Sequence, residues 1–182
     1  MSIVTENQTK LHRWIVWFLV KMIVKKIHIK KYVISGSYRR GKWWCNDIDL
    51  LIPIESVSEG EGIKAQLEKL GWKLRKSRFT SKDIFSVQYV KKMGNGNTVL
   101  DLFLALPGTW GNALLFTTGP KEFNDDLREE IVSKGYSWSN PSYFTRIKTD
   151  ERLSFTNEKA ALAFLDKKWI KPSQRGSYAR ND

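Results

Sequence analysis

Two aspartates separated by one apolar residue constrain this chain more than any other feature. Asp47 and Asp49 lie in the sequence NDIDLL at residues 46–51. Because successive side chains of a strand point to opposite faces, both carboxylates project from one face while Ile48 and Leu50 enter the core. Two carboxylates this close repel each other unless divalent cations neutralise them, and hard oxygen ligands suit Mg²⁺. The run therefore predicts a strand that carries a metal site.

A third acid, Asp101, lies in the apolar run 99–103, where an unpaired charge would be costly. If its strand neighbours that of Asp47 and Asp49, the three carboxylates form a triad. Such a triad could hold two Mg²⁺ ions, or Mn²⁺ in their place, and activate a hydroxyl for in-line phosphoryl transfer. The alternative is structural: Asp47 and Asp49 cap a strand edge, and Asp101 pairs with a nearby lysine.

A turn rich in glycine and arginine precedes the acidic strand, with the sequence GSYRRG at residues 36–41. Gly36 allows the backbone to approach a phosphate, the Ser37 hydroxyl can donate to its oxygens, and Arg40 offers a bidentate fork. A Gly-Ser turn or an arginine pair alone is more often a solvated surface. Next to an Asp-x-Asp strand, these residues predict a triphosphate-binding site.

The charge of the chain indicates a polyanionic partner. Lys and Arg number 31 against 19 Asp and Glu, a net charge of +12 over 182 residues. DNA is the first expectation, and an anionic membrane surface would attract the same charge. The apolar run 14–24 is interrupted by Lys21 and is shorter than the roughly 20 residues of a membrane span, so we expect no membrane partner.

The N-terminal sequence and the single cysteine indicate the cellular compartment of the protein. No leader with a cleavage site is visible, so secretion is not expected. The single Cys45 cannot form an internal disulfide and fits a reducing compartment, and His12 and His28 have no ligand spacing. We expect an intracellular monomer, in the cytoplasm or wherever its DNA lies, including a viral or nuclear setting.

The periodicity of the chain predicts an α+β fold. Helices are expected over 5–27, 61–70, 120–133 and 157–166, and strands over 32–34, 48–54, 72–79, 83–91, 98–103, 136–139 and 143–147. The first helix is expected to be buried on most sides. A hairpin at 94–97 makes the sheet mixed and largely antiparallel, flanked by helices. A change in composition near Pro107 predicts two parts, residues 1–107 and a small C-terminal α/β subdomain at 108–182 that ends in a basic tail.

The order of the motifs makes a resemblance specific. After the segments 36–41, 47–51 and 101–103 come FTTGP at 116–120, Asn124, Arg128, KGY at 134–136, TNEK at 156–159 and WIKP at 169–172. In this order and spacing, over roughly residues 30–175, the chain resembles the family X DNA polymerases. The resemblance implies a palm of the nucleotidyltransferase fold, followed by the thumb, called fingers in some nomenclatures, that closes on the nascent base pair. With only about 30 residues before the palm and no lyase domain expected, it is similar to the reduced two-subdomain viral form of the family.

The resemblance also implies roles for single residues. Asp47 and Asp49 would bind both metals, and Asp101 would bind the catalytic metal beside the primer 3′ hydroxyl. The nucleotide would be bound by Gly36, Ser37, Arg40, Asn46, Phe116, Thr117, Gly119 and Asn124, and DNA by Arg128, Lys134, Lys171 and Arg175. The chain departs from the family at three positions. Asn46 stands where the family often has Gly, and Val99 stands where many members have Arg. Thr117 stands where an aromatic residue is usual, and this difference bears on ribose discrimination.

The expected function is a template-directed DNA polymerase that adds dNTPs to a primer 3′ hydroxyl by two-metal-ion phosphoryl transfer. Its expected partners are gapped or primer–template DNA and dNTPs, with gap filling in DNA repair as the setting. One alternative is a template-independent terminal or RNA nucleotidyltransferase, which shares the Gly-Ser and Asp-x-Asp core; Asn124 and Arg128 favour a templated enzyme. Another is a non-catalytic, basic nucleic-acid-binding module with structural aspartates.

Overall fold

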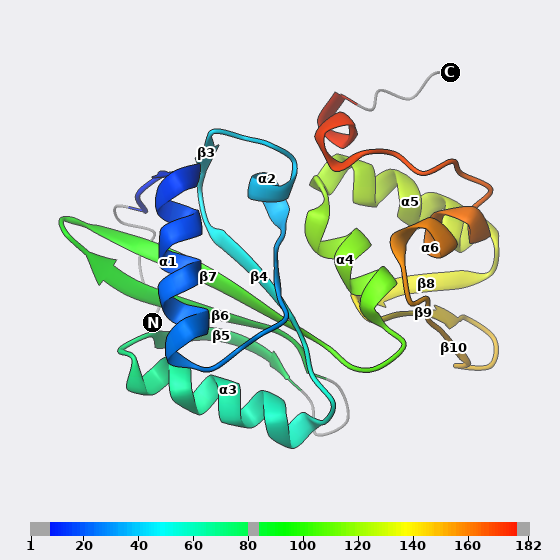
Figure 1. Ribbon diagram of the computed structural model, residues 1–182. Coiled ribbons are helices and arrows are strands. Elements are labelled where there is room, and N and C mark those ends of the chain that lie inside the picture. The colour runs from blue at the N-terminus through cyan, green and yellow to red at the C-terminus, as the bar shows by residue number, and fades with distance from the viewer. Residues whose placement is uncertain (1–7, 80–83, 178–182) are drawn as a thin grey trace.

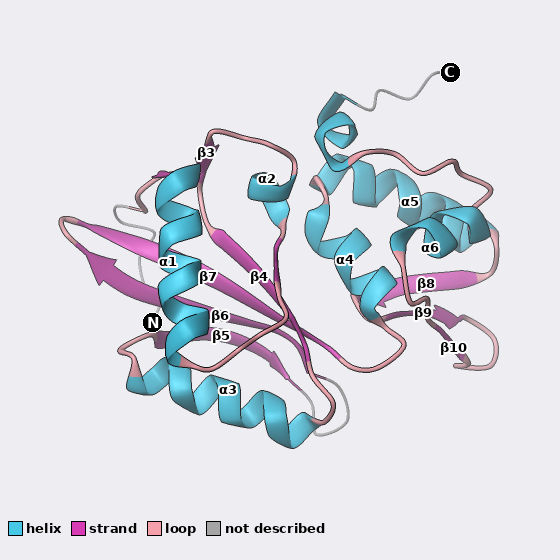
Figure 2. Cartoon of the chain, in the orientation of Figure 1, coloured by secondary structure: helices cyan, strands magenta, loops and turns pink. Residues whose placement is uncertain are grey.

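A five-stranded mixed sheet forms the centre of the N-terminal half of the chain (Figure 1). The computed structural model describes residues 8–79 and 84–177. The strands lie in the order β2 (Val33–Ile34), β4 (Ile48–Pro53), β7 (Gly96–Ala105), β6 (Ile84–Met93) and β5 (Lys73–Phe79). Helices α1 (Arg13–Lys26) and α3 (Val57–Lys69) lie on one face of this sheet (Figure 2). The α+β class predicted from the sequence is confirmed.

The parallel pair in this sheet is the one that carries the acids. Three of its four strand pairs are antiparallel, whereas β4 and β7 run in the same direction. The chain reaches β7 after α3 (Val57–Lys69), β5 and β6, a connection long enough to bring two parallel strands together. Asp49 and Asp101 are in register as Cα partners. The strand of Asp101 therefore neighbours that of Asp49, in a sheet that is mixed and largely antiparallel as expected.

Helix α1 (Arg13–Lys26) packs on the sheet through one stripe, Val16, Val20, Ile23 and Val24. Most of its other large apolar side chains stay exposed: Trp14, Ile15, Trp17, Phe18 and Met22. The expectation that this helix is buried on most sides is therefore wrong, because a helix lying on one sheet face buries only the side chains that point toward it. None of the helices in residues 8–79 and 84–177 is long and apolar enough to cross a membrane.

The start of α1 also differs from the expected position, because the residues before it form a strand. Leu11–His12 (β1) pairs with Trp44–Cys45 (β3), with Leu11 opposite the fully buried Cys45. His12 then caps the helix by accepting a hydrogen bond from Trp14 N. Residues 5–7 of the expected helix lie outside the described part of the chain.

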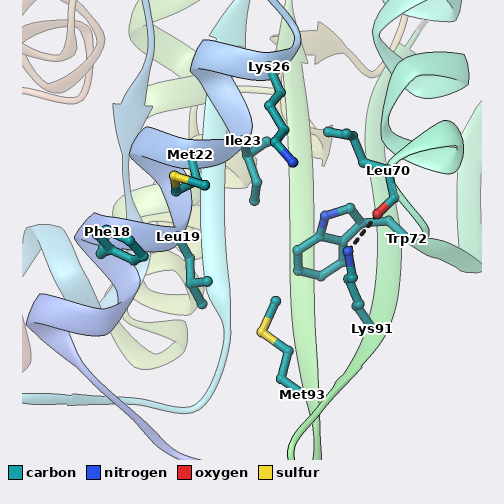
Figure 3. A pocket seen from close by; sticks show the side chains of 9 residues that line it. All are labelled: Phe18, Leu19, Met22, Ile23, Lys26, Leu70, Trp72, Lys91 and Met93. Carbon is teal, nitrogen blue, oxygen red and sulfur yellow. Dashed lines mark hydrogen bonds between the residues drawn. The ribbon is translucent and has the colours of Figure 1, made fainter.

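An apolar groove of about 180 Å³ separates α1 from the end of α3 and strand β6 (Figure 3). It is lined by Phe18, Leu19, Met22, Ile23, Lys26, Leu70, Trp72, Lys91 and Met93. Lys91 Nζ donates to Leu70 O at 2.6 Å and lies 6.0 Å from the Trp72 ring centroid. These contacts fix one wall of the groove, and the exposed apolar face of α1 continues into the other.

Helix α3 begins four residues before the expected position. Ser56 Oγ accepts from Glu59 N at 3.2 Å, and Glu59 Oε2 accepts from Glu55 N at 2.7 Å. This reciprocal capping satisfies two backbone donors that a helix start leaves free. It stabilises a first turn that Gly60 and Gly62 disfavour, which explains why the apolar pattern alone placed the start at residue 61.

The C-terminal half packs helices against a small sheet. Helices α4 (Trp110–Thr118), α5 (Lys121–Ser133) and α6 (Glu158–Phe164) pack with β8 (Tyr136–Asn140), β9 (Tyr143–Arg146) and β10 (Arg152–Leu153), and a 3₁₀ helix, η1 (Pro172–Ser177), follows. Helix α4 was not expected, because seven of its nine residues are buried and it has no polar face to reveal its period. Leu51 and Ala105 of the first half pack with Ala113 and Leu114 of α4. The division near Pro107 stays a prediction.

Candidate active site

The glycine-led turn folds as one helical turn that presses against the acidic strand. Gly36 begins α2 (Gly36–Arg39) with φ +53°, a conformation that glycine adopts without strain. A Cβ atom at Gly36 would lie 1.7 Å from Asp49 Oδ2. Ser35 N donates to Asp49 O at 2.8 Å and ties the two segments together. Glycine is required here because any side chain would occupy the space of the Asp49 carboxylate.

Burial raises the pKa values of all three acids, and the charges of neighbouring carboxylates add to the rise for Asp49 and Asp101. Burial raises the pKa of Asp49 well above its usual range, and the charges of Asp47 and Asp101 add to the rise. Burial also raises the pKa of Asp47, although a backbone hydrogen bond and the charge of Arg40 oppose it. For Asp101, burial raises the pKa to about 6 against a hydrogen bond from Gln88, with Asp47 adding to the rise. The three carboxylates therefore lie close enough to repel one another.

Asp101 faces an open pocket rather than a lysine partner. Its Oδ1 accepts from Nε2 of Gln88, its register partner on β6, at 2.8 Å. The pocket, of about 230 Å³, is lined by Lys76, Ser86, Gln88, Asp101, Phe103 and Phe116. The structural alternative, in which Asp101 pairs with a lysine, finds no support among the described residues. Sequence reasoning missed Gln88, whose place opposite Asp101 depends on strand register.

The donor chemistry fits a divalent cation, although the side chains are not gathered around one point. No three His, Cys, Asp or Glu side chains of the described residues are close enough together to hold a metal ion as they stand. Carboxylate oxygens are nevertheless the ligands that Mg²⁺ prefers, and a cation would relieve the repulsion that raises the pKa values here.

Two buried polar groups, one on α2 and one directly after it, lack a hydrogen-bond partner among the described residues. Ser37 Oγ and Arg40 Nε are buried without a hydrogen bond in the described part of the chain, although the thiol of Cys45, a weak partner, lies near Ser37. Arg40 Nη1 donates to Thr118 O at 2.5 Å. Burial lowers the pKa of Arg40, while the charges of the acids oppose this. Buried donors left unpaired are costly, so this side of α2 suits an anionic ligand such as phosphate.

Other expected nucleotide contacts gather at the junction of α4 and α5. Asn124 Nδ2 donates to Phe116 O at 2.8 Å, and its Oδ1 is buried without a partner among the described residues. Arg128 lies 5.7 Å from the ring centroid of Phe116. Gly119 ends α4 with φ +53°, and a Cβ there would lie 3.5 Å from Arg40 Nη1. The junction thus reaches the guanidinium group of α2.

Two further expected nucleotide contacts, Thr117 and Asn46, lie in different environments. Thr117 is buried, and its Oγ1 donates to Leu114 O of its own helix at 3.5 Å. The Asn46 side chain is exposed in the turn before β4, and its backbone O accepts from Gln8 Nε2 at 2.7 Å.

The four expected DNA contacts lie in different environments. Arg128 pairs with Asp125, Lys134 Nζ lies 2.6 Å from Asp166 Oδ2, and Lys171 is exposed. Arg175 is only 1% exposed. The expectation that Arg175 contacts DNA does not fit this burial, because its guanidinium group cannot reach a phosphate from the interior.

An ion-pair network joins α2 to the C-terminal half. Arg39 Nη2 binds Glu158 Oε2 at 2.7 Å, and Arg175 Nη1 binds Glu158 Oε1 at 2.9 Å. Arg39 Nη1 also donates to Thr118 Oγ1 at 2.6 Å. Arg39 and Glu158 were visible only as members of motifs, since no local pattern pairs residues so distant in sequence. The network ties α2 to Thr118 of α4 and Glu158 of α6.

Comparison with known proteins agrees with this architecture. A model of the DNA polymerase beta palm matches residues 7–100, and a model of the DNA polymerase beta thumb matches residues 113–176. DNA polymerase lambda of Arabidopsis thaliana is 27% identical over 168 residues, covering 79% of this chain and 31% of the relative. DNA polymerase lambda of Rattus norvegicus is 30% identical over 119 residues, covering 59% of this chain and 20% of the relative. The chain thus spans less than a third of the length of these relatives.

A mixed sheet with Asp49 and Asp101 in register on parallel strands, beside a glycine-led turn, has the architecture expected of a polymerase palm. Since the palm model alone matches about half of the chain, the chain belongs to the family X, or DNA polymerase beta-like, polymerases. The closer resemblance to the reduced viral form stays a prediction.

Proposed function

We propose that this chain is a DNA-directed DNA polymerase that adds dNTPs to the 3′ hydroxyl of a primer paired with a template. The observation that carries the proposal is the facing pair Asp49 and Asp101 on parallel strands, with the backbone of Gly36 pressed against Asp49. This arrangement brings hard oxygen ligands and a phosphate-binding turn to one place. In-line phosphoryl transfer needs both of these parts.

We assign the metal site to Asp47, directly before β4, Asp49 of β4 and Asp101 of β7. Asp47 and Asp49 would hold two Mg²⁺ ions, with Asp101 as the further ligand on the primer side and Mn²⁺ as a substitute. Bound ions supply positive charge to the transferring phosphoryl group. Gln88 donates to Asp101 Oδ1 and so orients that carboxylate.

The rest of the nucleotide would be bound by α2, α4 and α5. The free donors on Ser37 and Arg40 suit the oxygens of a triphosphate. Asn124 has an unpaired Oδ1 at the α4–α5 junction, where it could accept from the edge of an incoming base. Arg128 beside Phe116 is placed to contact the template strand. These contacts favour templated insertion over the template-independent alternative.

The biological setting extends the same proposal. We assign gapped or primer–template DNA as the substrate, gap filling in DNA repair as the process, and a monomer acting where the DNA lies. The net charge of +12 supports a DNA partner.

Nucleotide incorporation on a one-nucleotide gap tests the proposal. Each dNTP and NTP is offered singly with Mg²⁺ or Mn²⁺, and the primer alone replaces the gapped duplex in a parallel series. We expect only the dNTP that matches the template to be added. Equal addition of all nucleotides, or addition without template, would assign the chain to the template-independent class. No incorporation with either ion would support a non-catalytic DNA-binding module.

Matched variants connect the activity to the acids. Asp49→Asn and Asp101→Asn should abolish incorporation while DNA affinity stays within a few-fold of wild type. Asp150→Asn, in an exposed turn of the C-terminal half, is the control and should retain full activity. Incorporation near the wild-type rate in Asp49→Asn would remove this residue from the site.

A further inference from the structure

Another open pocket, separate from the pocket at Asp101, lies against the turn GSYRRG at residues 36–41. It has a volume of about 260 Å³ and is lined by Arg13, Trp14, Tyr38 and Trp43. Tyr38 lies within α2, and Arg13 Nη1 donates to Gly41 O at 3.3 Å. The pocket is therefore attached to the GSYRRG segment, yet none of the roles assigned above uses its four lining side chains.

The walls of this pocket are held in place despite their exposure. Arg13 N donates to Trp43 O at 2.8 Å, and β1 and β3 pair His12 with Trp44. The His12 ring stacks on Trp43 with centroids 5.8 Å apart and an interplanar angle of 25°. Trp43 is nevertheless 63% exposed and Trp14 is 66% exposed. Large aromatic rings that are oriented but not covered are typical of a binding surface.

The charge in the pocket selects the chemistry of its ligand. The Arg13 guanidinium carbon lies 4.9 Å from the Tyr38 ring centroid and 5.7 Å from that of Trp43. Arg13 forms no ion pair within the part of the chain that the structure describes. The sequence has no acid between Glu6 and Asp47, while ten Lys and Arg lie there. An unneutralised cation among aromatic rings repels cations and favours a ligand with a π face and a negative charge.

A nucleotide of single-stranded DNA has both properties. Unpaired bases stack on aromatic rings and on guanidinium planes, and cations hold the adjoining phosphates. The volume lies below the roughly 300 Å³ at which sites for drug-sized ligands begin, so it suits one base and excludes a duplex. We infer that this pocket binds one unpaired base of a single-stranded DNA flank, with Arg13 at its phosphate. The inference goes beyond the proposed reaction, because the pocket holds a strand and performs no chemistry.

Binding of short labelled oligothymidylate, followed by fluorescence anisotropy, tests the inference against an abasic oligomer of equal length and charge. Wild-type protein should prefer oligothymidylate. Trp43→Leu should weaken oligothymidylate binding by at least about fivefold, the effect of losing one base stack, and leave the abasic oligomer unaffected. Trp14→Leu should act in the same direction and serves if Trp43→Leu does not fold. Trp44→Leu, at an adjacent tryptophan that is 61% exposed but does not line the pocket, is the matched control and should bind like wild type.

The outcomes separate this inference from the proposed function. Equal oligothymidylate affinity in Trp43→Leu, Trp14→Leu and wild type overturns it, as does an equal loss for the abasic oligomer. Binding of phosphatidylserine vesicles that is lost in Trp43→Leu while oligothymidylate binding persists would also overturn it in favour of a membrane surface. Incorporation by wild-type protein on a one-nucleotide gap is measured separately. The inference can therefore fail while the polymerase assignment stands, and the polymerase assignment can fail while the inference stands.

Discussion

Glu158 and Arg175 form an ion pair with 2.9 Å between Oε1 and Nη1, although their side chains are only 5% and 0% exposed. The other oxygen of the same carboxylate binds Arg39 at 2.7 Å. One carboxylate thus neutralises two guanidinium groups, one from α2 and one from η1. Removing it would leave both cations without their partner in the interior.

Glu158→Gln should strongly destabilise the protein. Breaking a buried ion pair by removing one partner costs about 3–5 kcal/mol, because the remaining charge is buried and unpaired. Urea denaturation should show this loss in the free energy of unfolding. Glu151→Gln removes an exposed partner of Arg146 and should cost less than about 1 kcal/mol. Equal losses in the two variants would contradict the structural role of Glu158.

The same carboxylate predicts acid sensitivity. Burial alone would raise the pKa of Glu158, but hydrogen bonds and charges from Arg39 and Arg175 outweigh it and hold the pKa below its usual range. A lowered pKa in the folded state adds stability above the unfolded pKa of about 4.3, and this stability is lost as the pH falls through the folded pKa. Wild-type protein should therefore lose more stability than Glu158→Gln between about pH 5 and pH 3. If stability fell equally with pH in wild type and in Glu158→Gln, Glu158 would not titrate as described.

Asp101 predicts the opposite dependence near neutral pH. The pKa of Asp101 in the folded state is raised to about 6. Protonated Asp101 therefore adds stability at pH values below the unfolded pKa, and this stability is lost as the pH rises through 6. In buffer with EDTA, the melting temperature should fall between pH 5 and pH 8, roughly the range in which this group titrates. The melting temperature of Asp101→Asn should fall less over that range, and this variant should be more stable than wild type at pH 8. Asp150→Asn, outside the site, should follow the wild-type curve.

Gly36→Ala should damage the site beyond ordinary backbone strain. The added methyl would overlap Asp49 Oδ2, at 1.7 Å, and α2 must move to accommodate it. Incorporation should drop by at least about a hundredfold in kcat/KM, as positioning errors near 1 Å do. Gly135→Ala is the matched control, since its φ is +81° and nothing lies within 4 Å of the new Cβ. It should lose about 1–2 kcal/mol of stability from strain and keep its activity.

DNA affinity should depend steeply on salt. Each phosphate neutralised by Lys or Arg lowers log K by about 0.9 per unit of log salt. Lys168→Glu with Lys171→Glu, both exposed in the C-terminal segment, should weaken binding and reduce that slope by about 0.9 per lost contact. The control is Lys30→Glu with Lys31→Glu, which makes the same charge change in the exposed loop after α1. Affinity that barely responds to salt would show that stacking or shape holds the DNA.

Local sequence patterns predicted the parts of the site that depend on strand geometry. The alternation around Asp47 and Asp49 and the apolar run around Asp101 placed both acidic strands correctly. The glycine-led segment was expected as a turn and is a helical turn, a small difference. These features follow from backbone periodicity, which a sequence displays directly.

Features that depend on tertiary partners could not be predicted in this way. Arg175 and Lys171 look alike in a basic segment, yet one is buried on Glu158 and the other is exposed. Gln88 acquires its role from the register of β6 with β7. Arg180, in the basic tail, lies outside the described residues.

The burial of Cys45 has a practical consequence. It is the one cysteine of the chain, its side chain is fully buried, and burial raises the pKa of its thiol. Since the thiolate is the reactive form, maleimide dyes should leave the native protein unlabelled. Cysteines introduced at the exposed Lys31 and Lys148 would then be labelled selectively, one in each half of the chain. Energy transfer between two such dyes would report any change in the distance between the two halves when DNA and nucleotide are added, in a protein whose native thiol is left in place.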